Sequence, residues 1–138
     1  MEELIFDRKQ SDLVNDTPKG NYNITDLNRV EMWCRYVADL LTSYAYPVQI
    51  TTKTDWQMED MPTNTEMERI RTNIGKIKEA YYSLTSTPEL PSTINPIDIQ
   101  KANNIEKILY DIDLLIKNME ASFLFCGTFY AGESEGLN

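Results

Sequence analysis

The sequence predicts a mainly α-helical protein, a three-helix bundle with a small β element. Three segments carry apolar residues at alternating spacings of three and four, which is the pattern of an amphipathic helix. Three such stripes can pack against one another in a single core. A chain of 138 residues, 41% apolar and 25% charged, is long enough for one domain with its own core. We expect one helical domain over residues 1–138, with an irregular segment at 1–24 and a frayed tail at 132–138.

The N-terminal segment lacks a helical pattern. Leu4-Ile5-Phe6 is a short apolar run, which predicts a strand near residues 3–7. Pro18 and Gly20 are typical of turns. Thr25 is the predicted helix cap, because its side-chain oxygen can accept a hydrogen bond from a backbone N–H one turn on.

The first helix is predicted over residues 25–44. Its stripe consists of Leu27, Val30, Cys34, Val37, Leu41 and Tyr44. Pro47 stops the helix, since proline has no backbone N–H and disfavours helix in the residue before it. Arg29 and Glu31 are predicted to form an ion pair between helices that sets their register.

The chain between the first two helices combines a predicted strand and a loop. Residues 48–54 alternate apolar and polar side chains and are rich in β-branched residues, which predicts a half-buried strand. The loop that follows carries Trp56, Met58 and Met61. Tryptophan and methionine are enriched at interfaces, so these three residues are predicted partner contacts. The alternative is that they cover the ends of the helices.

The second helix is predicted over residues 65–86. Thr65 and Glu68 have the spacing of a capping box, in which each side chain bonds the other residue's backbone N–H. The stripe consists of Met67, Ile70, Ile74, Ile77, Tyr81 and Leu84. Gly75 interrupts it and is expected to allow a close contact.

The third helix is predicted over residues 98–121, antiparallel to the second, after a connector with three prolines. Its stripe is wide, so we expect it to contact both other helices; it includes Ala102, Ile105, Leu109, Ile112, Ile116 and Met119. Asn103 is a poor helix former, and we expect its side chain to bond the connector.

Residues 123–130 are aromatic, uncharged and β-prone, which predicts a third strand. Its cover would come from residues 3–7, from residues 48–54 or from the same segment of another subunit. Phe123, Phe125, Phe129 and Tyr130 are therefore predicted partner contacts.

The residues offer little reactive chemistry. The chain has no histidine, which removes the commonest general base and metal ligand. Cys34 and Cys126 have no metal-binding spacing and are expected to be free thiols. Asp111 and Asp113 are expected on a solvated helix face or at a helix cap, and Glu106 with Lys107 is expected to be part of the charged surface. We predict no catalytic residue, no metal and no cofactor.

The net charge of −9 and the pI near 4.4 disfavour nucleic acid and anionic membranes as partners, because those surfaces are bound by clustered Lys and Arg. No apolar run approaches the roughly 20 residues of a membrane helix. The acidic start of the chain is unlike a signal peptide, so we expect synthesis in the cytoplasm without processing.

Five blocks stand in a matching order over residues 4–133: Leu-Ile-Phe-Asp-Arg at 4–8, Asp-Leu-Asn-Arg-Val-Glu at 26–31, Pro-Thr at 62–63 with Glu-Met-Glu-Arg at 66–69, Ala-Asn-Asn-Ile-Glu-Lys-Ile-Leu at 102–109, and Phe-Tyr-Ala-Gly-Glu at 129–133. Together they resemble a module of structural proteins from phages and prophages of Gram-positive bacteria. The resemblance implies a non-catalytic virion component of the tail or baseplate, either a separate protein or a piece of a longer tail protein.

The leading hypothesis is therefore an assembly protein made in the host cytoplasm and located in the virion tail. It would bind other tail or baseplate subunits and could form a homo-oligomer. A first alternative is a small acidic regulator or inhibitor that binds a basic host protein or mimics nucleic acid. A second, an enzyme acting on surface glycan, would need a cleft with convergent carboxylates.

Overall fold

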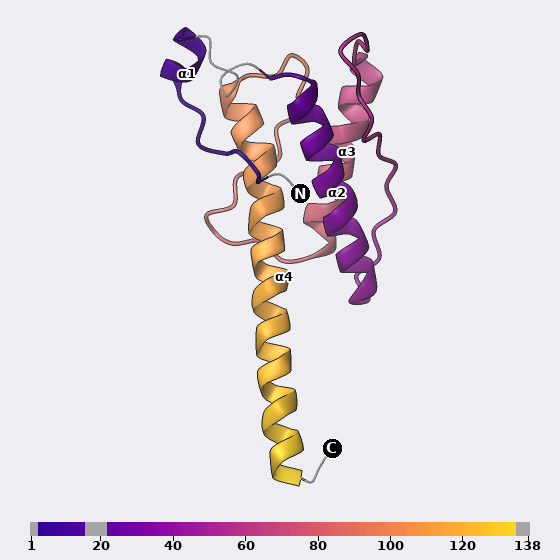
Figure 1. Ribbon diagram of the computed structural model, residues 1–138, viewed down its shortest axis with the longest axis vertical. Helices are drawn as coiled ribbons and strands as arrows, with labels where there is room; N and C mark the ends of the chain where they lie inside the picture. The colour runs from indigo at the N-terminus through magenta and orange to yellow at the C-terminus, as the bar shows by residue number, and fades with distance from the viewer. Residues whose placement is uncertain (1–2, 16–21, 135–138) are drawn as a thin grey trace.

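The protein is mainly helical, as predicted. The computed structural model describes residues 3–15 and 22–134, with side chains as far as residue 122. These residues form four helices and no strand: α1 (Gln10–Val14), α2 (Ile24–Ser43), α3 (Asn64–Ala80) and α4 (Ile99–Ser134) (Figure 1). Each of the three long helices contacts the other two. The mainly α class is confirmed, whereas the small β element is wrong for the residues described.

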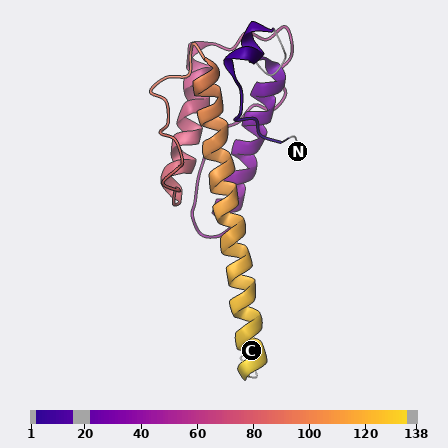
Figure 2. The same ribbon diagram turned by 90° about the vertical axis from the view of Figure 1, so that its left-hand side faces the viewer.

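The three long helices run in the same direction, and two long connections return the chain to the same end of the bundle (Figures 1 and 2). Asn95, just before α4, bonds Asn64 at the start of α3, and Tyr81, just after α3, bonds Met119 of α4. The predicted antiparallel pairing is therefore wrong. A 20-residue helix is about 30 Å long, and an extended chain of about ten residues spans that distance. The connections at 44–63 and 81–98 are both longer than this.

α2 begins one residue before its predicted start because Asn23, and not Thr25, caps it. The Asn23 side chain accepts hydrogen bonds from the backbone N–H groups of Thr25 (2.9 Å) and Asp26 (3.3 Å). Asp26 completes a capping box by accepting from the Asn23 N–H at 2.9 Å. After Ser43 the chain turns through Ala45, whose φ of 70° lies in the left-handed region.

Residues 48–54 form no strand, and their backbone groups bond side chains of the helices. Arg35 donates to the carbonyl of Ile50 at 2.9 Å, and Asn73 donates to that of Thr51 at 2.7 Å. The N–H of Lys53 donates to Glu31 at 3.0 Å. Helix side chains therefore satisfy backbone groups that a sheet would otherwise pair.

The predicted strand at residues 3–7 does not form either, and its backbone also bonds helix side chains. The N–H of Ile5 donates to the Glu106 carboxylate at 2.9 Å. Arg8 and Asn103 form a reciprocal pair, with the Arg8 N–H donating at 3.1 Å and the Asn103 amide donating back to the Arg8 carbonyl at 3.0 Å. Asn103 thus anchors the N-terminal segment. The predicted bond from Asn103 to the proline-containing connector is wrong. The segment predicted to be irregular, 1–24, also contains α1 and the start of α2.

α3 starts at a capping box two residues earlier than predicted. Thr63 accepts from the Glu66 N–H at 3.1 Å, and Glu66 accepts from the Thr63 N–H at 3.1 Å. The helix ends at Ala80 and not at residue 86, because Tyr81 turns to extended backbone and packs its ring 4.9 Å from that of Tyr46.

α4 continues through the segment predicted as a third strand. The backbone of residues 123–134 is helical, and this part of α4 projects beyond the ends of α2 and α3 in both views (Figures 1 and 2). The segment contains no proline, and no strand forms elsewhere in the described chain to pair with it. Helical backbone satisfies its own hydrogen bonds without a partner, which explains the outcome. Of the predicted frayed tail, residues 132–134 lie in α4 and residues 135–138 lie outside the described range.

The three predicted stripes form the core. Their buried members are Leu27, Val30, Cys34, Val37, Leu41, Met67, Ile70, Ile74, Ile77, Ala102, Ile105, Leu109, Ile112 and Ile116. Gly75 is close to the connector: a Cβ there would lie 3.1 Å from Cδ2 of Leu90. Helical periodicity therefore predicted most of the buried positions correctly. The exceptions are Tyr44, which is 37% exposed, and Tyr81, Leu84 and Met119, which are only partly buried.

Candidate functional site

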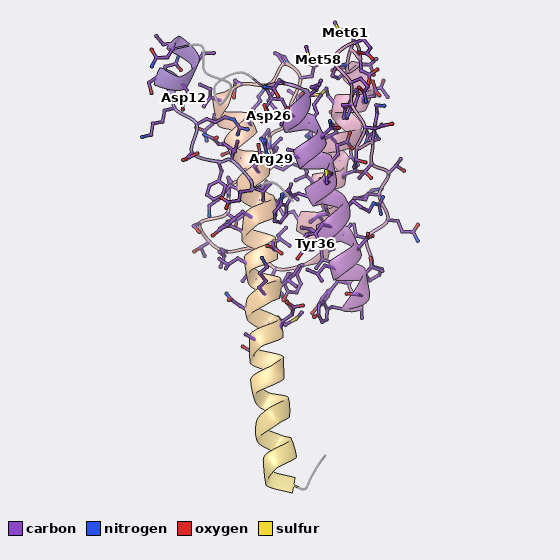
Figure 3. All side chains as sticks on the ribbon, viewed as in Figure 1. Asp12, Asp26, Arg29, Tyr36, Met58 and Met61 are labelled. Carbon is purple, nitrogen blue, oxygen red and sulfur yellow. The ribbon has the colours of Figure 1, made fainter. Side chains whose placement is uncertain are left out.

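The most unusual feature of the interior is a group of four buried charged residues, which we call the N-terminal charge cluster. Arg8 comes from the N-terminal segment, Asp26 and Arg29 from the first turns of α2, and Glu106 from α4. Their exposed fractions lie between 0% for Glu106 and 6% for Arg8. Figure 3 shows Asp26 and Arg29 on the upper part of α2. The sequence-based expectation of a solvated Glu106 is wrong.

Glu106 lies at the centre of this cluster. Its carboxylate accepts from Arg29 Nε at 2.8 Å, from Arg29 Nη2 at 2.9 Å and from Arg8 Nη2 at 2.6 Å. The Ile5 N–H supplies a further bond. Asp26 accepts from the Nη2 groups of both arginines. Two cations and two anions therefore neutralise one another away from water, as buried charges require.

The cluster shifts the pKa of one of its members, Arg29, and of one neighbour, Tyr22. Burial alone would lower the pKa of Arg29, but the hydrogen bonds and charges of Glu106 and Asp26 outweigh it, so the pKa rises. Tyr22 packs its ring against Arg8, with Cζ 5.6 Å from the ring centroid. Burial, with the charges of Glu106 and Asp26, raises the pKa of Tyr22 well above its ordinary value. Tyr22 therefore stays protonated near neutral pH.

A second polar group, the Glu31 cluster, joins α2 to α3 and to the first connection. Glu31 accepts two hydrogen bonds from Arg69, at 2.7 and 2.9 Å, and one from the Trp56 indole at 2.7 Å. The hydrogen bonds that Arg69 donates to Glu31 raise the pKa of Arg69. Burial, with the charge of Glu31, raises the pKa of the adjacent Cys34 thiol, which suppresses its reactivity.

The prediction that Arg29 and Glu31 form ion pairs between helices is confirmed, since each residue pairs with a residue of another helix. Their partners lie on different helices: Arg29 bonds Glu106 of α4, and Glu31 bonds Arg69 of α3. Sequence reasoning missed both partners. A signal was available in the apolar repeat of α4, because Glu106 follows the buried Ile105 and sits at the edge of that stripe.

Two more acids expected on a solvated face are buried. Asp111 accepts from Lys107 at 2.5 Å and from Thr87 at 2.6 Å. Asp113 is 4% exposed and pairs with Lys117 at 2.8 Å. The Asp113 pairing raises the pKa of Lys117. These acids tie α4 to itself and to the second connection, and they do not converge on a shared cleft.

The structure separates the residues that we predicted as partner contacts. Trp56 is 3% exposed and belongs to the core, where its indole bonds Glu31. Met58 and Met61 are 83% and 82% exposed and lie at the end of the bundle opposite the projecting part of α4 (Figure 3). Phe123, Phe125, Phe129 and Tyr130 lie on the projecting helix, and their side chains fall outside the described range. Partner binding by these residues stays a prediction, and Trp56 lacks the exposure to form such a contact.

Tyrosines gather where α4 leaves the bundle. The rings of Tyr46 and Tyr81 are 4.9 Å apart, and those of Tyr81 and Tyr82 are 5.2 Å apart. The Tyr44 hydroxyl donates to Glu120 at 2.5 Å. We call Tyr44, Tyr46, Tyr81 and Tyr82 the tyrosine collar; Tyr82 is 70% exposed.

A shallow polar groove of about 820 Å³ runs between residues 49–51 and α3. Arg69 and Asn73, which line it, already bond Glu31 and the Thr51 carbonyl. Within the described residues, no three His, Cys, Asp or Glu side chains lie together in a way that could hold a metal ion. Across the same residues, none of the helices combines the length and apolar character needed to span a membrane.

Comparison of the chain with protein families, with curated proteins and with solved structures found no significant match.

Proposed function

We propose that the chain is a non-catalytic structural subunit of a phage virion, located in the tail or baseplate and acting through protein–protein contacts. The resemblance over residues 4–133 supports this role. The structural observation that carries the proposal is the projection of α4 beyond the bundle, because a helix that extends past its own domain offers contact surface to other subunits.

The hydrogen bonds and ion pairs of the buried carboxylates also favour a structural role. Glu106 and Asp26 are bound by arginines, and Glu31 is bound by Arg69 and Trp56. A general acid or base needs a substrate within hydrogen-bond reach and a pKa matched to its task. These carboxylates instead hold the N-terminal segment, the helices and the first connection in place.

The contact to other tail subunits is assigned to the projecting part of α4. Phe125 and Phe129 are four residues apart and share one helix face by register. The exposed Met58 and Met61 at the opposite end offer a second contact. Methionine and phenylalanine are both enriched in interface cores.

The test is the fate of the protein in purified particles of the phage that encodes it. We expect immunogold labelling at the tail. A chain with Phe125→Asp and Phe129→Asp should fold but fail to enter particles, while Val14→Asp, which adds a charge at a 74% exposed site on α1, should still be incorporated. Absence of the unmodified protein from particles would overturn the proposal.

The acidic-regulator alternative draws support from the net charge of −9. Five of the acids that contribute to this charge are buried, however: Asp26, Glu31, Glu106, Asp111 and Asp113. Buried and paired carboxylates do not present themselves to a basic partner. Salt-sensitive binding of a basic host protein, with no incorporation into particles, would favour this alternative.

A further inference from the structure

The buried seam of α4 does not stop where the bundle stops. Inside the bundle it consists of residues spaced alternately by four and three: Ile105, Leu109, Ile112, Ile116 and Met119. The same spacing then continues through Phe123, Cys126 and Tyr130. This is a heptad repeat, the pattern by which one helix pairs with another.

The two helices that cover the seam end at one level. Tyr44, just after α2, bonds Glu120, and Tyr81, just after α3, bonds Met119. Residues 121–134 continue as helix for fourteen residues, about 21 Å at 1.5 Å per residue. In the described chain, no helix runs beside it (Figures 1 and 2). The heptad pattern therefore predicts that a second helix packs against this segment, and the described residues of the same chain contain no such helix.

The charge pattern indicates which helix that is. Residues 121–132 contain no Asp, Glu, Lys or Arg, and the same holds for residues 40–52 and 80–88, which meet α4 at the tyrosine collar. Two copies of a chain with a net charge of −9 repel each other, and this end is where they can approach with the least repulsion. Helices that select a different partner do so with flanking charges, which this segment lacks.

The aromatic residues of the seam supply part of a stable contact. Each fully covered Phe or Tyr contributes about 150–250 Å². Phe123 and Tyr130 together could supply about 300–500 Å² per copy, against roughly 800 Å² per partner in a standard interface. The rest of the contact would come from Met119, Cys126 and the exposed part of the tyrosine collar, where Tyr82 is 70% exposed.

We propose that the projecting part of α4 pairs with the same segment of a second copy of this chain, along the seam Met119–Phe123–Cys126–Tyr130, with the tyrosine collar at the edge of the contact. This inference goes beyond the virion role and does not depend on it. The seam of the self-contact is separate in register from Phe125 and Phe129, so the two proposals can fail independently.

The first test is the mass of the full chain in solution by light scattering and sedimentation. We expect a multiple of 16.0 kDa that shifts to 16.0 kDa when Phe123→Asp and Tyr130→Asp are combined. Leu13→Asp combined with Val14→Asp, an equal charge change at two exposed α1 residues, should leave the mass unchanged. A monomeric unmodified chain at all concentrations up to about 100 μM, a concentration at which contacts of micromolar affinity form, would overturn the proposal.

The second test leaves the aromatic residues of the seam unchanged. Cys126 lies on the proposed seam near the middle of the projecting segment, so the two thiols face each other in a parallel pair and are offset by three residues, about 4.5 Å along the axis, in a fully overlapped antiparallel pair. A two-electron oxidant such as diamide should link them as a disulfide-bonded dimer. Cys126→Ser should abolish the link, while Cys34 stays protected in the core. Failure of the unmodified chain to cross-link under conditions that oxidise free cysteine would overturn the proposal.

Discussion

Arg29 and Glu106 form a two-pronged ion pair across the interface of α2 and α4, with Nε to Oε1 at 2.8 Å and Nη2 to Oε2 at 2.9 Å. The two residues are 77 positions apart in the chain. Because Arg8 and Ile5 bond the same carboxylate, this pair also places the N-terminal segment against the bundle. One buried glutamate thus organises three parts of the chain that are distant in sequence.

Removing that carboxylate should be costly. Glu106→Ala leaves Arg8 and Arg29 buried with Asp26 as their remaining anion, so we expect a loss of about 3–5 kcal/mol in the free energy of unfolding. Urea denaturation followed by circular dichroism measures it. The matched control is Glu68→Ala, which breaks the exposed pair with Arg71 and should cost less than about 1 kcal/mol. Equal losses for the two variants would contradict the central role of Glu106.

The buried thiol of Cys34 should make stability fall at high pH. Burial holds the pKa of Cys34 well above its ordinary 9.0, so above pH 9 the unfolded chain loses this proton while the folded chain keeps it. The unfolded state is then favoured, by up to about 1.4 kcal/mol per pH unit. Below pH 9 this contribution is constant.

The comparison is with Cys34→Ala, measured by urea denaturation at pH 7–11. The variant should be less stable at neutral pH, but its stability should fall less steeply above pH 9. Tyrosines and lysines titrate in both proteins and cancel in the comparison. Parallel pH profiles would show that the thiol ionises equally in both states.

Trp56 should behave as a core residue in spite of its place in a loop. Trp56→Ala removes a side chain that is 3% exposed and takes one donor from Glu31, so we expect a loss of about 3–5 kcal/mol. Met58→Ala, at an 83% exposed position two residues on, should change stability by less than about 0.5 kcal/mol. Thermal melting of the two variants distinguishes them. A small effect for Trp56→Ala would mean that the loop is not fastened to the bundle.

Gly75 offers a stabilising substitution. Alanine favours helix over glycine by up to about 1 kcal/mol, and the new Cβ would meet only the end of the half-buried Leu90 side chain, at 3.1 Å. That side chain can shift by a few tenths of an ångström, so Gly75→Ala should raise the free energy of unfolding by about 0.5 kcal/mol. Gly75→Leu should lower it, since the larger side chain must displace Leu90. Destabilisation by the alanine would indicate that Leu90 is held rigidly.

Local pattern was sufficient to predict which residues form helices and which faces they bury. α2 was placed to within one residue at each end, and every core position of its stripe from Leu27 to Leu41 is buried. The helix ends were less accurate where a neighbouring residue could serve the same purpose. Thr63 and Thr65 both precede a glutamate by three residues, and the chain uses the first.

Tertiary structure decided the features that depend on distant residues. Segments 3–7 and 48–54 have the side-chain pattern of strands, but their backbone groups form hydrogen bonds with helix side chains and not with another strand. The acids Glu106, Asp111 and Asp113 are buried because cations from other turns or segments reach them. The chain between α3 and α4 is long enough for either direction, and the packing of α4 against α2 and α3 decided that the helices run parallel.

The sequence by itself therefore determined the helical class, the three buried stripes and the absence of histidine chemistry, because periodicity and composition are local properties. Only the tertiary structure decided that the helices run parallel, that charges lie inside and that α4 continues past its neighbours. The physical reason is that a buried charge needs a counter-ion and a backbone group without a strand partner needs a hydrogen-bonding side chain. Those partners come from distant parts of the chain, so a local pattern does not reveal them.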